Sequence, residues 1–361
     1  MTPATDPATE AVLDSLVIGA GQAGLSSSFH LRRLGIDHVV LDANDAAGGA
    51  WQHRWDALTM ADVHGVADLP DAPLPAAVGP ERANELVPAY FAAYEQDHGL
   101  PVERPVPVEH VRQDPDDPAL LLVDSGGGTW RTRTLVNASG TWRRPFIPRY
   151  PGQEVFAGEQ LHTAGYPGRE HFRGKRVLVV GGGASAVQFL GALRPVTDTL
   201  WVTRREPVWR TGRFDPEAGR EAVAMVAERV QQGLPPRSVV SVTGLMLRPQ
   251  EAEAERLGAY ERRPMFQRVE PDGVRWDDGS FEPVDVILWA TGFRPDVEHL
   301  APLHLRSSRG GIQLGATRAT ATESVVDPRV QLVGYGPSAS TIGANRAGRT
   351  AAVAVRRHLR P

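Results

Sequence analysis

The chain has 361 residues, with 39 Lys and Arg against 43 Asp and Glu, and it contains no cysteine. This length favours two α/β domains over one small core, and the near-balanced charge excludes a broad basic field for nucleic acid. The lack of cysteine excludes disulfides, thiolate metal sites and electron transfer through a redox-active dithiol. We expect no metal site.

Residues 1–11 are small, polar and proline-bearing, and we expect them to form a disordered tail. No apolar run reaches the roughly 20 residues that a membrane span needs, and the N-terminus lacks the apolar core of a signal peptide. The expected location is therefore the cytoplasm, with no membrane partner.

The first structural motif is a strand, a glycine loop and a helix. An apolar run at 16–18 predicts a buried parallel strand, and Gly19, Gly21 and Gly24 follow it as G-x-G-x-x-G. A helical pattern and a second apolar strand come next, and that strand ends in Asp42. Glycine triplets alone often mark only a tight turn. In this βαβ context they predict a dinucleotide site, with phosphates at the helix N-terminus and the ribose diol on Asp42.

The segment after Asp42 carries two adjacent glycines, ending at Gly49, and then Trp51. This arrangement suits backbone packed against a flat group, although a glycine turn with half-buried tryptophans is the plainer interpretation. Periodicity predicts a helix over 84–98, a β-hairpin over 120–134 and a strand over 135–140.

A second nucleotide-binding unit begins with a predicted strand at 176–180. Gly181, Gly183 and Ala186 form G-x-G-x-x-A, in which alanine replaces the third glycine, and Ser185 lies inside the loop. The pattern predicts another phosphate loop at a helix N-terminus.

The strand predicted at 199–203 ends in Arg204 and Arg205, where an NADH site carries an acid. Two guanidinium groups can clamp a 2′-phosphate, so the pair favours NADPH over NADH. A pair of solvated arginines is the alternative interpretation.

The remaining pattern is looser. Helices are predicted over 216–232 and 252–257, and a strand over 284–289 leads to Thr291 and Gly292. A last strand at 330–333 runs into Gly334, followed by a helix through residue 355. A glycine turn that opens a late helix can place a helix N-terminus against a flavin ring.

Residues 156–167 read F-x-G-x-x-x-H-x-x-x-Y-P, with His162 and Tyr166 at the defining positions. This segment resembles the fingerprint of the class B flavoprotein monooxygenases, in the form with Tyr that N- and S-oxygenating members use. Baeyer–Villiger members usually carry Trp at the position of Tyr166. With both glycine loops, the chain looks most like the short soluble bacterial flavin-containing monooxygenases.

The resemblance implies an α/β fold of two Rossmann-like domains. An FAD domain (12–154 and 284–361) would be interrupted by an NADPH domain (155–283). It also implies a C4a-(hydro)peroxyflavin that oxygenates sulfur or nitrogen of small lipophilic compounds, with molecular oxygen as co-substrate. His162 and Tyr166 would position the two domains. Baeyer–Villiger oxidation of ketones and an NADPH:acceptor reductase stay open, and a homodimer is the general expectation.

One position departs from the family pattern. Many members place an Asn near the peroxyflavin, and Ala61 takes that place here. Asp62 or His64 would be the substitutes. Without one of them, the resemblance implies an uncoupled NADPH oxidase that releases hydrogen peroxide.

Overall fold

A computed structural model describes most of the chain. The described residues are 11–63, 66–76, 80–209, 216–236, 244–245, 247 and 251–360. The expected N-terminal tail therefore lies, except for residue 11, outside the described residues.

The chain divides into two compact units. Unit 1 comprises Met1–Gly140, Arg220–Val239 and Pro295–Pro361, and unit 2 comprises Thr141–Gly219 and Val240–Arg294. These bounds differ from those expected from the sequence. The segment 220–239 belongs to unit 1, because α4 (Pro216–Gln231) buries Val226 and Val230 and the latter joins a core cluster of that unit. Residues 141–154 and 284–294 belong to unit 2, where Phe146 pairs with Gly292.

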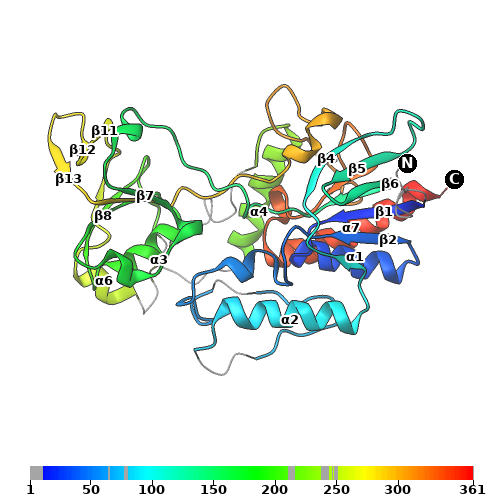
Figure 1. The fold of residues 1–361 in the computed structure, drawn as a ribbon, viewed down its shortest axis with the longest axis horizontal. Coiled ribbons are helices and arrows are strands. Elements are labelled where there is room, and N and C mark those ends of the chain that lie inside the picture. Colours follow the sequence, from blue (N-terminus) through cyan, green and yellow to red (C-terminus); the bar gives the residue numbers. More distant parts are fainter. Residues whose placement is uncertain are drawn as a thin grey trace, which may run out of the picture. The chain divides into compact units, whose positions relative to one another are not determined.

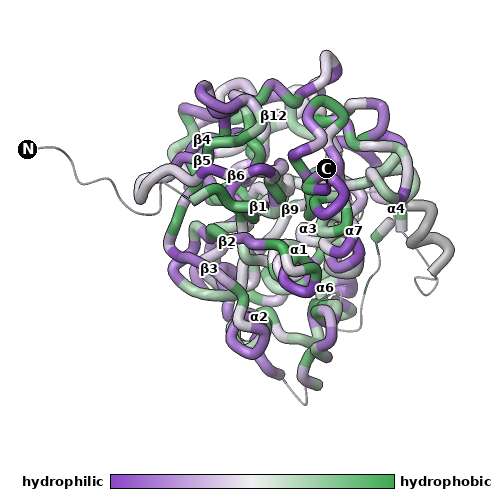
Figure 2. The backbone as a smooth tube through the Cα atoms, turned by 90° about the vertical axis from the view of Figure 1, so that its right-hand side faces the viewer, coloured by the Kyte–Doolittle hydropathy of each residue, from purple (hydrophilic) through white to green (hydrophobic). Residues whose placement is uncertain are grey.

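Unit 1 is built on a seven-stranded sheet. Its neighbouring strands are, in order, β3 (Val102–Glu103), β2 (His38–Leu41), β1 (Val12–Ile18), β6 (Gly128–Asn137), β5 (Leu121–Ser125) and β4 (Val108–Gln113), and β15 (Val330–Leu332) also pairs with β6. The pairs of β3, β2, β1, β6 and β15 are parallel, whereas β4, β5 and β6 form an antiparallel meander. Along β1 the tube of Figure 2 is mostly green, in keeping with Leu16 and Val17, which are fully buried.

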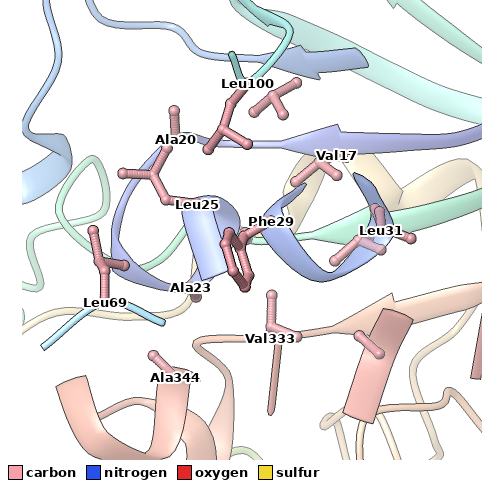
Figure 3. Packing of buried hydrophobic residues seen from close by; sticks show 14 of the residues in the cluster. Val17, Ala20, Ala23, Leu25, Phe29, Leu31, Leu69, Leu100, Val333 and Ala344 are labelled. Atoms are coloured by element: carbon pink, nitrogen blue, oxygen red, sulfur yellow. The ribbon is translucent and has the colours of Figure 1, made fainter. Parts of the chain in front are cut away.

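Helices α1 (Gln22–Arg33) and α7 (Thr341–Leu359) lie side by side in unit 1 (Figure 1). Figure 3 shows Phe29 of α1 between Val17 of β1 and Val333, which follows β15. Helix α2 (Ala83–Asp97) adds Phe91 to the same core. The described part of the unit also contains three short 3-10 helices: η2 (Gly49–His53), η7 (Glu298–Leu303) and η8 (Gly336–Ser338).

Unit 2 has a five-stranded parallel sheet in the order β10 (Arg262–Arg263), β9 (Asp198–Val202), β8 (Arg176–Val180), β14 (Val286–Trp289) and β7 (Glu159–His162). A small antiparallel sheet joins β11 (Arg268–Glu270), β12 (Gly273–Arg275) and β13 (Phe281–Pro283). The helices among its described residues are α3 (Ala184–Leu193), α6 (Ala252–Arg256), η3 (Gln153–Val155), η4 (Thr163–Gly165) and η5 (Arg169–Phe172). Both units are thus α/β, as predicted, with a parallel sheet in unit 2 and a mixed sheet with a parallel core in unit 1.

The long predicted elements are confirmed within one or two residues, including the hairpin of β5 and β6. The strand predicted at 135–140 is the end of β6 and not a separate strand. Helix α7 continues to Leu359, four residues beyond the predicted end. Along the described part of the chain, none of the helices combines the length and the apolarity required to cross a bilayer.

Candidate functional site: two glycine loops at helix N-termini

In unit 1 the chain leaves β1 through a glycine turn and enters α1 without a side-chain cap. Gly19 has φ +96°, a value that L side chains rarely adopt. Gly21 is the N-cap residue, no described side chain caps the helix, and its first turn holds no acid. The first backbone N–H groups of α1 therefore remain available to an anion.

The glycines of this loop leave room that side chains would fill. A Cβ at Gly24 would lie 1.8 Å from the carbonyl oxygen of Gly19, so the third glycine lets helix and strand approach. A Cβ at Gly49 would lie 2.8 Å from Cα of Gly21, so the second glycine segment reaches the phosphate loop. At Gly21 itself the nearest heavy atom to a Cβ would be 3.9 Å away. Gly21 therefore keeps space open above the helix N-terminus.

Asp42 directly follows β2 and is 3% exposed. Its Oδ1 accepts from the side-chain amide of Asn44 at 3.0 Å, and the Arg104 guanidinium lies 3.4 Å from its Oδ2. Arg104 is itself held by Glu95, whose hydrogen bond raises the pKa of Arg104. The carboxylate is thus held in place while it keeps lone pairs for a diol. Sequence reasoning missed Arg104 and Glu95, because only tertiary structure, including the pairing of β3 with β2, brings them next to Asp42.

Segments far apart in the sequence meet at the start of α1. The amide of Gln22 donates to Ala67 O at 3.1 Å and to Asn345 Oδ1 of α7 at 3.0 Å. Among the described residues nothing donates to the buried Oε1 of Gln22. A Cβ at Gly334 would lie 3.7 Å from Cβ of Ala23, so the turn after β15 also reaches this point.

Trp51 lies in η2, partly buried against the core of unit 1. The Arg54 guanidinium is 5.6 Å from its ring centre, and burial lowers the pKa of Arg54 to about 10.

Four features of unit 1 together fit a dinucleotide such as FAD. They are the helix N-terminus that no described side chain caps, the glycine cradle, the buried carboxylate of Asp42 and the Gln22 oxygen that no described donor reaches.

Asp62 stabilises a local turn with Thr59. Its Oδ2 accepts from the Thr59 hydroxyl at 2.7 Å, and its own N–H donates to Thr59 O at 2.9 Å. Ala61 is exposed beside it. His64 lies outside the described residues. The structure therefore gives Asp62 a folding role, and a part in the chemistry stays a prediction.

Unit 2 repeats the glycine loop after β8. Gly181 has φ +148°, and a Cβ there would lie 2.2 Å from Ala290 O. Gly183 is the N-cap residue of α3, again without a described side-chain cap, and a Cβ at Gly183 would meet nothing within 4 Å. Ala186 is fully buried where the other loop has its third glycine, and Ser185 is exposed on the first turn. The cradle fits a second dinucleotide.

The carboxyl end of β9 lies beside this loop. A Cβ at Gly182 would lie 3.7 Å from Thr203, and the next residues, Arg204 and Arg205, are exposed. Arg262 of β10 joins them, because its Nε donates to Thr203 Oγ1 at 2.9 Å and its side chain also reaches Thr203 O at 3.1 Å. Sequence reasoning missed Arg262, because its proximity depends on the pairing of β10 with β9.

His162 closes β7 and is 8% exposed. Its Nδ1 accepts from the backbone N–H of Ala164 at 3.0 Å, which leaves Nε2 to donate to Gly292 O at 2.9 Å. Burial lowers the pKa of His162, so the ring is neutral at pH 7. The ring also packs edge-on against Phe293. His162 thus ties β7 to the turn after β14, entirely within unit 2.

The other residues predicted around it lie in the same unit. The Tyr166 ring packs against Phe172 and against Phe189 of α3, and burial raises its pKa. The Thr291 hydroxyl donates to Phe146 O. These contacts anchor the fingerprint segment to the Rossmann-like core of unit 2.

Residues 16–234 match the family described as pyridine nucleotide-disulphide oxidoreductase. The chain belongs to this family. A flavin-containing monooxygenase from Stenotrophomonas maltophilia is 35% identical, with a TM-score of 0.82 over 97% of this chain and 99% of that one. Together these matches place the chain among the class B flavoprotein monooxygenases, as residues 156–167 indicated.

Two further relatives carry curated names. Indole-3-pyruvate monooxygenase YUCCA1 of Oryza sativa subsp. japonica is 28% identical over 82% of this chain and 80% of its own length. A Baeyer-Villiger monooxygenase of Streptomyces coelicolor is 31% identical over 55% of this chain and 39% of its own length.

The chain is therefore a flavin-dependent monooxygenase, and the predicted cofactors, FAD and NADPH, are those of its family. The disulphide chemistry in the family's description needs thiols, and this chain has no cysteine.

Proposed function

We propose that FAD binds unit 1, that NADPH binds unit 2, and that the substrate is a soft nucleophile, a sulfur or nitrogen atom of a small lipophilic compound. The observation that carries the proposal is the pair of open glycine cradles, each after a parallel strand and at a helix N-terminus that no described side chain caps. Unit 2 adds Arg204, Arg205 and the Tyr-bearing fingerprint segment. Tyr166 supports heteroatom oxygenation over Baeyer–Villiger chemistry.

When bound, NADPH supplies a hydride and the flavin activates dioxygen, so the cofactors carry the chemistry. The chain's own task is to bind and orient. In unit 1 the N-terminus of α1 would neutralise the pyrophosphate, and Asp42 would accept from the ribose hydroxyls. In unit 2 the N-terminus of α3 would hold the pyrophosphate, and the arginines would hold the 2′-phosphate. His162 holds its proton on Nε2 and keeps the turn at Gly292 in place, and it has no free nitrogen to act as a base.

A Baeyer–Villiger reaction is the second candidate, supported by the Streptomyces coelicolor relative. Uncoupled oxidation of NADPH is the third, because Ala61 stands where many relatives place an amide and Asp62 is engaged with Thr59.

The test is product analysis with isotopically labelled dioxygen. The FAD-loaded protein is incubated with NADPH, ¹⁸O₂ and either methyl phenyl sulfide or cyclohexanone, and hydrogen peroxide is measured in parallel. We expect sulfoxide that carries one ¹⁸O atom, with little peroxide. Labelled lactone from cyclohexanone without sulfoxide would establish the second candidate. NADPH consumption matched by peroxide, without either product, would establish the third.

A further inference from the structure

Unit 2 contains a cavity of about 670 Å³ that is open to solvent, is lined mostly by exposed residues and lies outside both glycine cradles. It is lined by the segment 143–149 and by one further residue, Arg294. The volume falls in the range of small-molecule sites. The lining residues are Arg143, Arg144, Pro145, Phe146, Ile147, Pro148, Arg149 and Arg294.

The backbone around this cavity is held by hydrogen bonds. The N–H of Phe146 donates to Gly292 O at 2.9 Å, and the N–H of Arg294 donates to Arg144 O at 2.9 Å. Pro145 and Phe293 form an isolated antiparallel bridge. Two prolines at 145 and 148 restrict the segment further. The arginines therefore project from a fixed scaffold.

The residues that line the cavity carry positive charge and include no Asp or Glu. Four of its eight lining residues are arginines, and neither 141–151 nor 290–295 contains an acid. No described carboxylate forms a salt bridge with Arg143, Arg149 or Arg294. Elsewhere in unit 2 arginines do have such partners, as Arg262 has Glu206 and Arg275 has Glu270.

The other half of the lining is apolar. The Arg294 guanidinium lies 4.1 Å from the ring centre of Phe146, which fixes the cation over an aromatic floor. Ile147 is 43% exposed, so its apolar side chain is open to a ligand. A ligand that suits both halves combines an anionic group with an apolar body. Guanidinium groups bind carboxylates in bidentate geometry.

We propose that this cavity binds small organic carboxylic acids, with the carboxylate on the arginines and the apolar body on Phe146, Ile147 and Pro148. This site is additional to the proposed cofactor sites and does not depend on which substrate is oxygenated.

The test is calorimetric titration of the FAD-loaded protein with phenylacetate, with the neutral isostere phenylacetamide and with inorganic phosphate. We expect phenylacetate to bind at least tenfold more tightly than either of the others, and its affinity to fall as salt is raised. Equal binding of phosphate would overturn the organic-acid assignment, and equal binding of the amide would overturn the role of the arginines.

The variant Arg143→Gln with Arg149→Gln should weaken phenylacetate at least tenfold. The matched control is Arg256→Gln with Arg318→Gln, which removes the same charge from two exposed arginines outside the cavity and should leave binding unchanged. Equal weakening by both pairs would overturn the site.

Two further measurements keep the test independent of folding and of NADPH. Ile147→Ser removes an exposed side chain and should weaken phenylacetate while the bound FAD content stays unchanged. NADP⁺ at saturation should not displace phenylacetate. Displacement would assign the arginines to the nucleotide and overturn the proposal, whereas the monooxygenase test with labelled dioxygen would be unaffected.

Discussion

At the scale of single residues, four histidines are held in their neutral form. His38, His162 and His299 are buried, and burial lowers the pKa of each. Burial, with Arg349 and Arg33 nearby, lowers the pKa of His30 to about 4. In the unfolded chain each of these groups would titrate near pH 6.5. The unfolded state therefore binds more protons than the folded state below that pH.

We expect the free energy of unfolding to be constant with respect to these groups above pH 6.5 and to fall as the pH drops from 6.5 toward 4. Lowered carboxylate pKa values, such as that of Glu270 at about 2, add to this loss of stability below about pH 5, where carboxylates of the unfolded chain begin to take up protons. Urea denaturation at several pH values measures the slope. The variant His30→Gln should flatten it, and a wild-type profile that is flat between pH 6.5 and 5 would contradict the prediction.

Two glycines of the first loop are expected to differ in their roles: Gly24 is needed for folding, and Gly21 is needed for cofactor binding. Gly24→Ala places Cβ 1.8 Å from Gly19 O, so we expect loss of folded protein. Gly21→Ala has room in the free protein, and its methyl group would occupy the space proposed for the pyrophosphate. This variant should keep its secondary structure and bind FAD about tenfold more weakly, a change of about 1.4 kcal/mol. Circular dichroism and flavin fluorescence measure the two properties. Unchanged FAD affinity in Gly21→Ala would contradict the proposed site.

In the proposed function, Arg204 and Arg205 provide the preference for NADPH over NADH. If they clamp a 2′-phosphate, Arg204→Ala with Arg205→Ala should raise KM for NADPH about tenfold or more, because each charge-assisted contact contributes about 1.5–3 kcal/mol. KM for NADH should change little. Steady-state oxidation of both nucleotides provides the comparison, with Arg256→Ala as the control. An equal loss with NADH and NADPH would contradict the clamp.

At the scale of elements, α1 and α7 pack at close range through small side chains. A Cβ at Gly348 of α7 would lie 2.6 Å from Ser26 Oγ and 2.8 Å from the backbone nitrogen of Ser27. The serine side chain can rotate, but the backbone nitrogen of a buried helix cannot retreat without moving α1. The C-terminal helix α7 therefore packs directly against α1, the helix that follows the first glycine loop.

We expect Gly348→Ala to lower the free energy of unfolding by about 1–3 kcal/mol through overpacking. FAD retention should fall with it, because the start of α1 would shift. The control is Val353→Ala on the exposed side of the same helix, where the change should stay within about 0.5 kcal/mol. Chemical denaturation compares the variants. Equal stability of Gly348→Ala and the wild type would show that the helices separate at little cost.

The sequence predicts the long elements and both loops, because local periodicity and glycine spacing determine them. It does not reveal β7 as a strand, because residues 159–162 lack alternation and gain strand structure from pairing with β14. The same limit applies within the candidate site. The contacts of Gln22 with Asn345, and of Arg262 with Thr203, join residues far apart in the chain, and only tertiary packing brings them together.

At the scale of the whole molecule, the two units have separate cores. One cluster of unit 1 includes Val17, Phe91 and Ala351, and a second includes Leu16 and Leu332. The core of unit 2 includes Leu178 and Trp289. None of these described clusters combines residues of both units. The domain bounds were the least predictable feature of the fold, because a segment such as 220–239 joins a unit through tertiary contacts and carries no signal of its own.

Separate cores predict that each cofactor stabilises its own unit. A ligand at one hundred times its Kd adds about 2.7 kcal/mol to the folded state, which corresponds to roughly 5–10 °C in Tm for units of this size. Calorimetry of the cofactor-free protein should resolve two transitions. FAD should raise one and NADP⁺ the other. In Gly183→Ala, where the added methyl group meets no protein atom within 4 Å, the NADP⁺ shift should vanish while the FAD shift persists. If each cofactor raised both transitions equally, the assignment of one cofactor to each unit would lose its support.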